Sequence, residues 1–322
     1  MYPYLFKPIL KQTIWGGSKI IPFKNLSEDL NNVGESWEIS GVSGSESIVA
    51  NGPDAGLTLT QLVREYKGDL VGDDNYAQYH DKFPLLIKFI DAKQDLSIQV
   101  HPDDEMAKLH HDSLGKTEMW YIIDAEKDSS INLGFSQEIT PKEYKQRIHN
   151  HSILEVLKNH KIKKGDVFFI PAGRVHSLGA GSFIAEIQQT SDVTYRIYDF
   201  DRKDAEGNPR ELHTNLAAEA LDYSVLDDYG THYKSNKNEP VELVACPYFT
   251  TSLYEIDEDI TCDYTELDSF MIFICMEGKC KMIDDQDNEI TIEAGQTVLF
   301  PATTMEVTII PEGEVKMLET YI

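Results

Sequence analysis

Four side chains from three separate segments of the sequence could together bind one metal ion. Gln99 and His101 lie in SIQVHPDD, Glu118 lies in GKTEMW, and His176 lies in PAGRVHSLG. If SIQVH is a β-strand, its alternate side chains point to one face, so Gln99 and His101 are presented on the same side. Two imidazoles, one carboxylate and one amide oxygen suit a divalent ion such as Zn²⁺, with water or substrate completing the coordination. The sequence therefore predicts a metal site to which several strands contribute.

The elements that would position these ligands are mostly short strands. Runs rich in β-branched and aromatic residues, separated by Gly, Pro, Asn and Asp, are SWEIS, ESIVA, PLLIKFIDA, LSIQV, MWYII, DVFFI, SFIAEIQQ and VTYRIYDF. Such runs predict a sandwich or barrel. Helical periodicity is confined to residues 57–66, 103–112, 140–160 and 214–223, where Thr140 is the expected cap of the third helix. We expect a mainly β protein with inserted helices.

A degenerate repeat indicates which β fold this is. A glycine, a proline and a further turn residue precede a possible ligand twice with the same spacing, as Gly165, Pro171, Gly173 and His176, and as Gly295, Pro301, Thr303 and Glu306. The spacing is that of a cupin motif. Because the second copy lacks the histidine, we expect two cupin-like β-barrel (jelly-roll) domains, of which only the first binds metal.

The boundary between the two domains is expected in a polar stretch. Residues 227–240, DDYGTHYKSNKNEP, contain few large apolar side chains and are the best candidate for a linker. The predicted division is a metal-binding, catalytic cupin domain with helical inserts at residues 1–235, and a degenerate cupin domain without metal at residues 240–322.

The composition and net charge limit which classes of molecule the protein is expected to bind. The 322 residues include 55 acidic and 29 basic ones, a formal net charge of −26, which disfavours nucleic acid and anionic membranes. A phosphorylated substrate stays possible, because a few converging cations can reverse the field inside a pocket. With no signal sequence or membrane span, we expect a cytoplasmic protein. We also expect a monomer or a weak homo-oligomer. The four cysteines are expected to be reduced thiols.

Six motifs in a fixed order make the resemblance to a known family specific. They are GESWEIS, PLLIKFIDA, LSIQVHPDD, GKTEMWYI, PAGRVHSLG and DVTYRIYDFDR. In this order they resemble the type I mannose-6-phosphate isomerases of the shorter bacterial form, over most of residues 1–215. The resemblance implies an enzyme that interconverts mannose 6-phosphate and fructose 6-phosphate.

The resemblance also implies roles for individual residues. Gln99, His101, Glu118 and His176 match the family's ligands to one Zn²⁺ per chain, and Arg196 matches its active-site arginine. Isomerisation moves a proton between C2 and C1 through an enediol-type intermediate, so negative charge develops on two adjacent oxygens. A zinc ion and a permanently charged guanidinium would stabilise that charge.

Lys116 is a candidate for substrate positioning or proton transfer. It lies two residues before Glu118, so both side chains face one side of an extended chain, and it corresponds to a lysine that precedes the family's ligand glutamate. An ordinary solvated lysine is the alternative. Longer family members carry a histidine at the position of Gly115. If that histidine transfers a proton in those relatives, another residue must do so in this chain.

Asp192 is the next candidate for proton transfer, because it precedes Arg196 by four residues as in the family. An ion-pairing carboxylate is an equally good interpretation. Arg196 has a similar alternative, as a strand arginine paired with Asp192 or Asp199.

Lys88 and Ser97 are the predicted phosphate-binding residues. They keep the family's spacing to Gln99, and a lysine within the apolar strand LLIKFID is explained by a bound anion. Its alternative is an ammonium group that extends to the solvent at a strand edge.

Two other functions fit part of the pattern. Two histidines and a carboxylate also suit an Fe²⁺-dependent cupin oxygenase, although Gln99 as a fourth ligand would fill a position that oxygen chemistry needs open. A non-catalytic sugar-binding or regulatory cupin is the second alternative, and the sequence has no DNA-binding motif to support a regulatory role.

Overall fold

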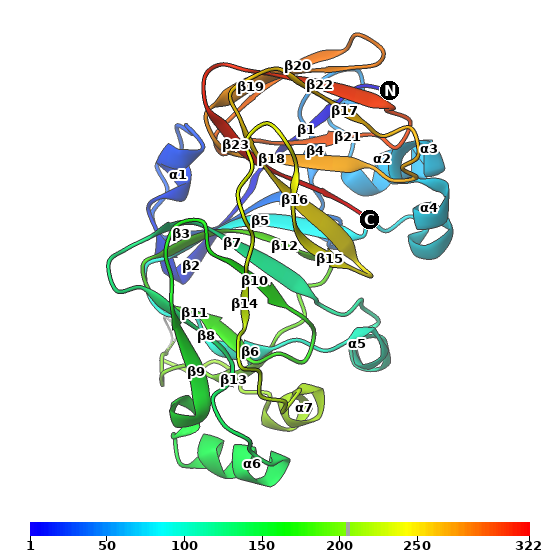
Figure 1. The fold of residues 1–322 in the computed structure, drawn as a ribbon. Helices are drawn as coiled ribbons and strands as arrows, with labels where there is room; N and C mark the ends of the chain where they lie inside the picture. The colour runs from blue at the N-terminus through cyan, green and yellow to red at the C-terminus, as the bar shows by residue number, and fades with distance from the viewer. Residues whose placement is uncertain (204–206) are drawn as a thin grey trace.

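The structure, a computed structural model that describes residues 1–203 and 207–322, is built mainly from four antiparallel sheets (Figure 1). Residues 9–231 supply a seven-stranded and a five-stranded sheet. The seven-stranded sheet has the order β14 (Gly230–Thr231), β10 (Val167–Ile170), β7 (Glu118–Ala125), β12 (Ser182–Gln189), β5 (Leu85–Ala92), β2 (Ile9–Gly17) and β3 (Val33–Ile39). The five-stranded sheet has the order β13 (Tyr195–Tyr198), β6 (Ile98–Val100), β11 (His176–Leu178), β8 (Ser130–Phe135) and β9 (Leu157–Lys161).

The other two sheets are formed mainly by the last third of the chain. A seven-stranded sheet has the order β15 (Val241–Cys246), β16 (Phe249–Ile256), β23 (Val315–Tyr321), β18 (Met271–Glu277), β21 (Thr297–Phe300), β1 (Tyr4–Lys7) and β4 (Ile48–Val49). A four-stranded sheet has the order β17 (Ile260–Asp263), β22 (Glu306–Pro311), β19 (Lys279–Asp284) and β20 (Glu289–Glu293). The N-terminal strand β1, blue in Figure 1, thus lies among the orange and red strands.

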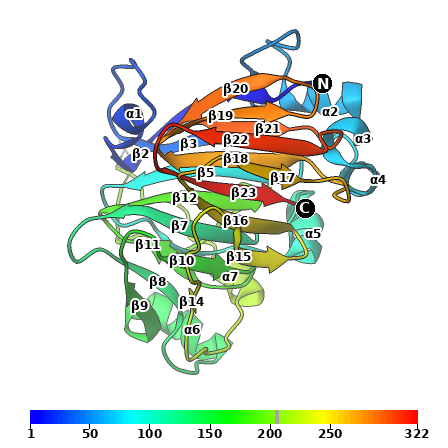
Figure 2. The ribbon, with the colours of Figure 1, turned by 45° about the horizontal axis from the view of Figure 1, so that its top comes forward.

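The helices lie outside the sheets (Figures 1 and 2). They are α1 (Ile20–Phe23), α2 (Leu59–Tyr66), α3 (Gly68–Val71), α4 (Asp73–Tyr79), α5 (Asp104–His111), α6 (Pro141–His149), α7 (Thr214–Ala220) and the 3-10 helix η1 (Ile153–Val156). Within residues 1–203 and 207–322, none is long and apolar enough to cross a membrane. All four cysteines are free thiols, as expected.

The predicted β architecture is confirmed, and so is the structural basis of the repeat. Gly165 and Gly295 both have a φ of +87°, and in each copy a four-residue strand begins two residues after the glycine. The next strand begins at the ligand position, at His176 in one copy and at Glu306 in the other. His176 is buried whereas Glu306 is exposed, so the second copy keeps the turn and has lost the ligand.

The expected helix at residues 140–160 is correct only in its first half. Thr140 caps α6 as predicted, because its hydroxyl accepts from the backbone N–H of Glu143 at 3.1 Å. The helix ends at His149, His151 takes a φ of +53°, and the chain continues as η1 and the edge strand β9. Pairing of β9 with β8 outweighs the local helical pattern.

Alternate side chains of the central strand β5 point to opposite faces of its sheet, one face toward the main core and the other toward the predicted metal site. On β5, the side chains of Leu85, Ile87 and Phe89 belong to a core that also contains residues of β18 and β23, between the two seven-stranded sheets (Figure 2). Lys88 and Ile90 point to the opposite face, toward the five-stranded sheet. Burial of both faces explains why PLLIKFIDA is apolar apart from Lys88 and Asp91.

The first part of the segment predicted as a linker is attached to the sheets that residues 9–231 form. Within it, β14 pairs with β10, Tyr229 donates a hydrogen bond to the Phe135 carbonyl at 3.0 Å, and Tyr233 donates one to the Gly165 carbonyl at 2.8 Å. Between β14 and β15, Lys237 forms an isolated bridge with Glu255 of β16, so the end of the segment contacts the C-terminal sheet.

Candidate active site

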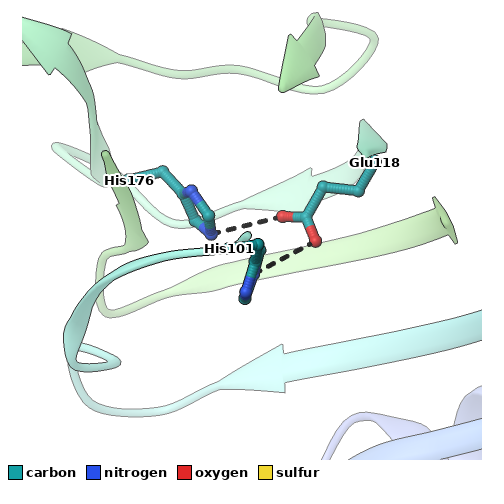
Figure 3. Close-up of side chains that lie close together, drawn as sticks. All are labelled: His101, Glu118 and His176. Carbon is teal, nitrogen blue, oxygen red and sulfur yellow. Dashed lines mark ion pairs between the residues drawn. The ribbon is translucent and has the colours of Figure 1, made fainter. Parts of the chain in front are cut away.

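The predicted metal ligands come from the two sheets that residues 9–231 form, and they meet between these sheets. Figure 3 shows three of them, His101, Glu118 and His176. Glu118 is the first residue of β7 in the seven-stranded sheet. Gln99 lies in β6 and pairs in register with His176, the first residue of the adjacent β11 in the five-stranded sheet. His101 follows directly after β6. Strand register therefore brings these residues together from positions far apart in the sequence.

The three charged or basic ligands form a compact cluster. The Nε2 atom of His101 lies 3.5 Å from one oxygen of Glu118, and the Nε2 atom of His176 lies 3.3 Å from the other. All the ligand atoms of this cluster lie within 4.8 Å of one another. The Gln99 amide lies 3.2 Å from the His176 Nε2, and turning that amide by 180° would present its oxygen instead.

Hydrogen bonds to the backbone fix how the imidazoles face the cluster. The Nδ1 of His101 donates to the carbonyl of Val193 at 3.0 Å, and the Nδ1 of His176 donates to that of Arg174 at 2.8 Å. Each neutral ring then presents the lone pair of Nε2 to Glu118. Two lone pairs that face a carboxylate repel it unless a cation lies between them.

The hydrogen-bond inventory fits such a cation. In the described part of the chain, the Nε2 of His101 and both carboxylate oxygens of Glu118 are buried without a hydrogen-bond partner. Leaving a buried carboxylate without compensation costs several kcal/mol. One divalent ion would coordinate these orphaned atoms, so the residues present fit a metal site.

The pKa shifts of the cluster also favour a bound cation. Burial, together with the nearby Glu186, raises the pKa of Glu118 to about 8, and burial lowers the pKa of His176 to about 4 and that of His101 well below its usual value. The histidines are therefore neutral and ready to bind metal, whereas the carboxylate needs positive charge beside it.

Lys116 supplies part of that charge. Its ammonium group lies 3.8 Å from an oxygen of Glu118 and is buried, and burial followed by repulsion from Lys88 lowers its pKa. Gly115 has no room for a side chain, because a Cβ atom there would lie 2.7 Å from the backbone of Asp103. The start of α5 fills the space that a histidine would need.

A cavity of about 240 Å³ opens beside the cluster and collects the other predicted site residues. Its walls include Lys88, Ser97, Gln99, Lys116, Asp192 and Arg196. Every residue that the sequence predicted for substrate binding or catalysis therefore faces one space.

Glu186 in β12 is a site residue that the sequence analysis missed. Its carboxylate accepts from the Lys88 ammonium at 3.0 Å and from the Trp120 indole N–H at 2.7 Å. Both partners lie directly opposite Glu186 on the neighbouring strands β5 and β7. The sequence did contain an indication of this role. A glutamate within the apolar run SFIAEIQQ must be buried, and it therefore needs a partner of opposite charge, as the lysine in LLIKFID does.

Removing this carboxylate should destabilise the protein strongly. We expect Glu186→Leu to lower the free energy of unfolding by about 3–5 kcal/mol, because the Lys88 ammonium would stay buried without its partner. Urea unfolding measures this loss. The double variant Lys88→Met with Glu186→Leu should recover most of the stability, and equal losses in both variants would contradict the interpretation.

Arg196 lies at the rim of the cavity, directly opposite Gln99 in the pairing of β13 with β6. Its guanidinium donates to the carbonyl of Glu211 at 3.1 Å. The ion pairs of the described residues include none between Arg196 and Asp192, and Asp199 pairs with Arg202 and Arg210 instead. The structure thus gives no support to an ion-pair role for Arg196.

Comparison with known proteins places this geometry in a family. The profile of the phosphomannose isomerase type I catalytic domain matches residues 4–133, and that of the mannose-6-phosphate isomerase cupin domain matches residues 240–322. Mannose-6-phosphate isomerase ManA of Bacillus subtilis is 37% identical over 290 residues, 88% of each chain. The chain belongs to the type I mannose-6-phosphate isomerase family. It is therefore an isomerase with the cupin fold.

Further relatives agree. The mannose-6-phosphate isomerase of Streptococcus mutans is 34% identical over 264 residues, 82% of each chain. A crystal structure of the Bacillus subtilis mannose 6-phosphate isomerase superimposes with a TM-score of 0.89 at 33% identity, over the full length of both chains. The predicted family, fold and enzyme class are confirmed.

Proposed function

We propose that this isomerase interconverts mannose 6-phosphate and fructose 6-phosphate with one Zn²⁺ per chain, bound by Gln99, His101, Glu118 and His176. The observation that carries the proposal is the buried Glu118 carboxylate, which faces two imidazole lone pairs and has no hydrogen-bond partner among the described residues, beside a cavity lined by lysine and arginine. Two neutral nitrogens, an amide oxygen and a carboxylate suit zinc. When bound, the ion supplies positive charge that polarises the oxygens on C1 and C2 of the sugar.

Lys116 is proposed to move the proton between C1 and C2. Its ammonium lies beside Glu118 and also faces the cavity, so it can reach the carbons whose oxygens lie at the metal. A buried amine with a lowered pKa gives up and regains a proton more readily than a solvated one. Asp192, exposed at the mouth of the cavity, is the second candidate for this role.

The remaining residues orient the substrate. Lys88 and Ser97 are proposed to bind it from the floor of the cavity, where Glu186 fixes the position of the lysine. Arg196 is proposed to supply a permanent positive charge at the rim. Lys88 lies within β5 and Ser97 directly precedes β6, and both are buried, so little ordering is left to occur when substrate binds.

Isomerisation in deuterium oxide tests both the reaction and its path. The zinc-loaded protein should convert mannose 6-phosphate to fructose 6-phosphate, and NMR should show deuterium at C1 of the product, because the Lys116 ammonium exchanges with solvent. Absence of conversion would overturn the proposed function and favour a non-catalytic cupin. Conversion with complete retention of the original hydrogen would overturn the role of an exchangeable proton carrier.

A further inference from the structure

Three arginines gather around one carboxylate at the rim of the cavity. Asp199, which is only 4% exposed, accepts two hydrogen bonds from Arg210, from Nε at 2.7 Å and from Nη2 at 2.5 Å. Arg202 donates to the same carboxylate at 2.5 Å and to the carbonyl of Asp95 at 2.6 Å. Arg196 is close enough to Arg210 and Arg202 for both to act on its ionisation.

The three arginines are held close together at this rim, around one buried carboxylate. Three guanidinium groups lie around the buried carboxylate of Asp199. The two other nearby carboxylates are exposed: Asp192 lies at the mouth of the cavity, and the side chain of Glu211 is 83% exposed. Burial and then repulsion from Arg210 lower the pKa of Arg196. In a chain with a net charge of −26, such a concentration of cations beside a cavity indicates an anionic ligand.

At the floor of the cavity, each lysine is paired with a carboxylate. The ammonium of Lys88 is matched by Glu186 at 3.0 Å, and that of Lys116 lies beside Glu118 at 3.8 Å. Each floor lysine thus has a carboxylate of its own. A phosphate dianion is better compensated at the rim, which leaves Lys88 and Ser97 to bind sugar hydroxyls.

Arg210 is built into the rim so that part of its guanidinium stays available. Asp199 occupies two of the five N–H donors, and Arg210 lines the cavity together with Arg196. The segment that carries it is fastened to β13, since His213 donates its backbone N–H to the carbonyl of Arg196 at 2.8 Å and accepts that of Arg196 on its ring nitrogen at 3.1 Å. Such fixed guanidinium groups suit bidentate binding of phosphate.

We infer that Arg210 binds the phosphate group of the sugar phosphate together with Arg196, and that Asp199 acts as the positioning residue that holds Arg210. The inference rests on the proposed function, because it names the part of that substrate that the rim recognises. It also sets the orientation of the substrate, with the phosphate at the rim and the reacting carbons at the metal cluster.

Kinetics of Arg210→Gln test the inference. With mannose 6-phosphate, KM should rise about 10- to 100-fold while kcat changes less than about threefold, since a charged hydrogen-bond pair to the substrate is lost and the metal cluster is untouched. Asp199→Asn should also raise KM, by a smaller factor than Arg210→Gln does. The matched control is Arg64→Gln. It removes an arginine of α2 that pairs with Asp81, and it should leave KM unchanged.

Calorimetric binding of inorganic phosphate separates this inference from the proposed function, because it needs no turnover. Phosphate should bind the zinc-loaded protein, and Arg210→Gln should weaken it about 10-fold or more. Unchanged phosphate binding and KM in the folded Arg210→Gln protein would overturn the inference, as would a loss confined to kcat. A loss of phosphate binding in Lys88→Met but not in Arg210→Gln would instead place the phosphate at the floor.

Discussion

Replacing His176 with alanine should abolish both metal binding and turnover. His176 supplies one of the two neutral nitrogens of the cluster, so its removal takes away one of the proposed ligands of the ion that would offset the burial of Glu118. We expect the metal content to fall from one ion per chain to nearly none, and kcat/KM to fall by about a thousandfold or more. Elemental analysis of the purified variant and a mannose 6-phosphate assay measure the two effects.

The matched control is His232→Ala, because the His232 side chain is 82% exposed and pairs only with Asp228 among the ion pairs of the described chain. It should keep full metal content and activity. A His176→Ala protein that retained its metal, or that turned over substrate without it, would show that the cluster is not the catalytic metal site.

Replacing Arg196 with alanine should separate metal binding from catalysis. Arg196 faces the cavity from β13 and makes no contact with His101, Glu118 or His176 among the recorded hydrogen bonds and ion pairs of the described residues, so the metal should be retained. Loss of a permanent charge that faces the substrate should lower kcat/KM by about 100-fold or more. Steady-state kinetics together with elemental analysis test this result.

Arg147→Ala, which removes an arginine that pairs with Glu143 within α6, is a suitable control. A near-normal kcat/KM in Arg196→Ala would contradict the assigned role. Loss of metal in that variant would mean that the strand pair β6 and β13, rather than the substrate, depends on this arginine.

Local patterns were sufficient to predict many of the strands that carry the site, although Glu186 and the edge strand β9 were missed. The runs around Lys88, Glu118 and Glu186 are apolar and short because their strands are buried on both faces, and the chemistry-bearing residues interrupt that pattern. Motif order then assigned the ligands, and the structure brings all of them to one cavity wall or cluster.

Features that depend on distant pairing were not predictable in this way. Nothing local indicates that β1 pairs with β21 across almost the whole chain, or that residues 157–161 form an edge strand instead of continuing a helix. The Lys88 and Glu186 pair arises from cross-strand register over 98 positions, and Arg210 reaches the site only because its segment folds back onto β13.

Metal removal and restoration is the most direct test of the central claim that a zinc ion at this cluster drives isomerisation. The purified protein should lose mannose 6-phosphate conversion after chelation and recover it on addition of about one equivalent of Zn²⁺ per chain. Recovery should fail in His176→Ala. Full activity in the chelated, metal-free protein, or restoration by Fe²⁺ with oxygen consumption and not by Zn²⁺, would contradict the account.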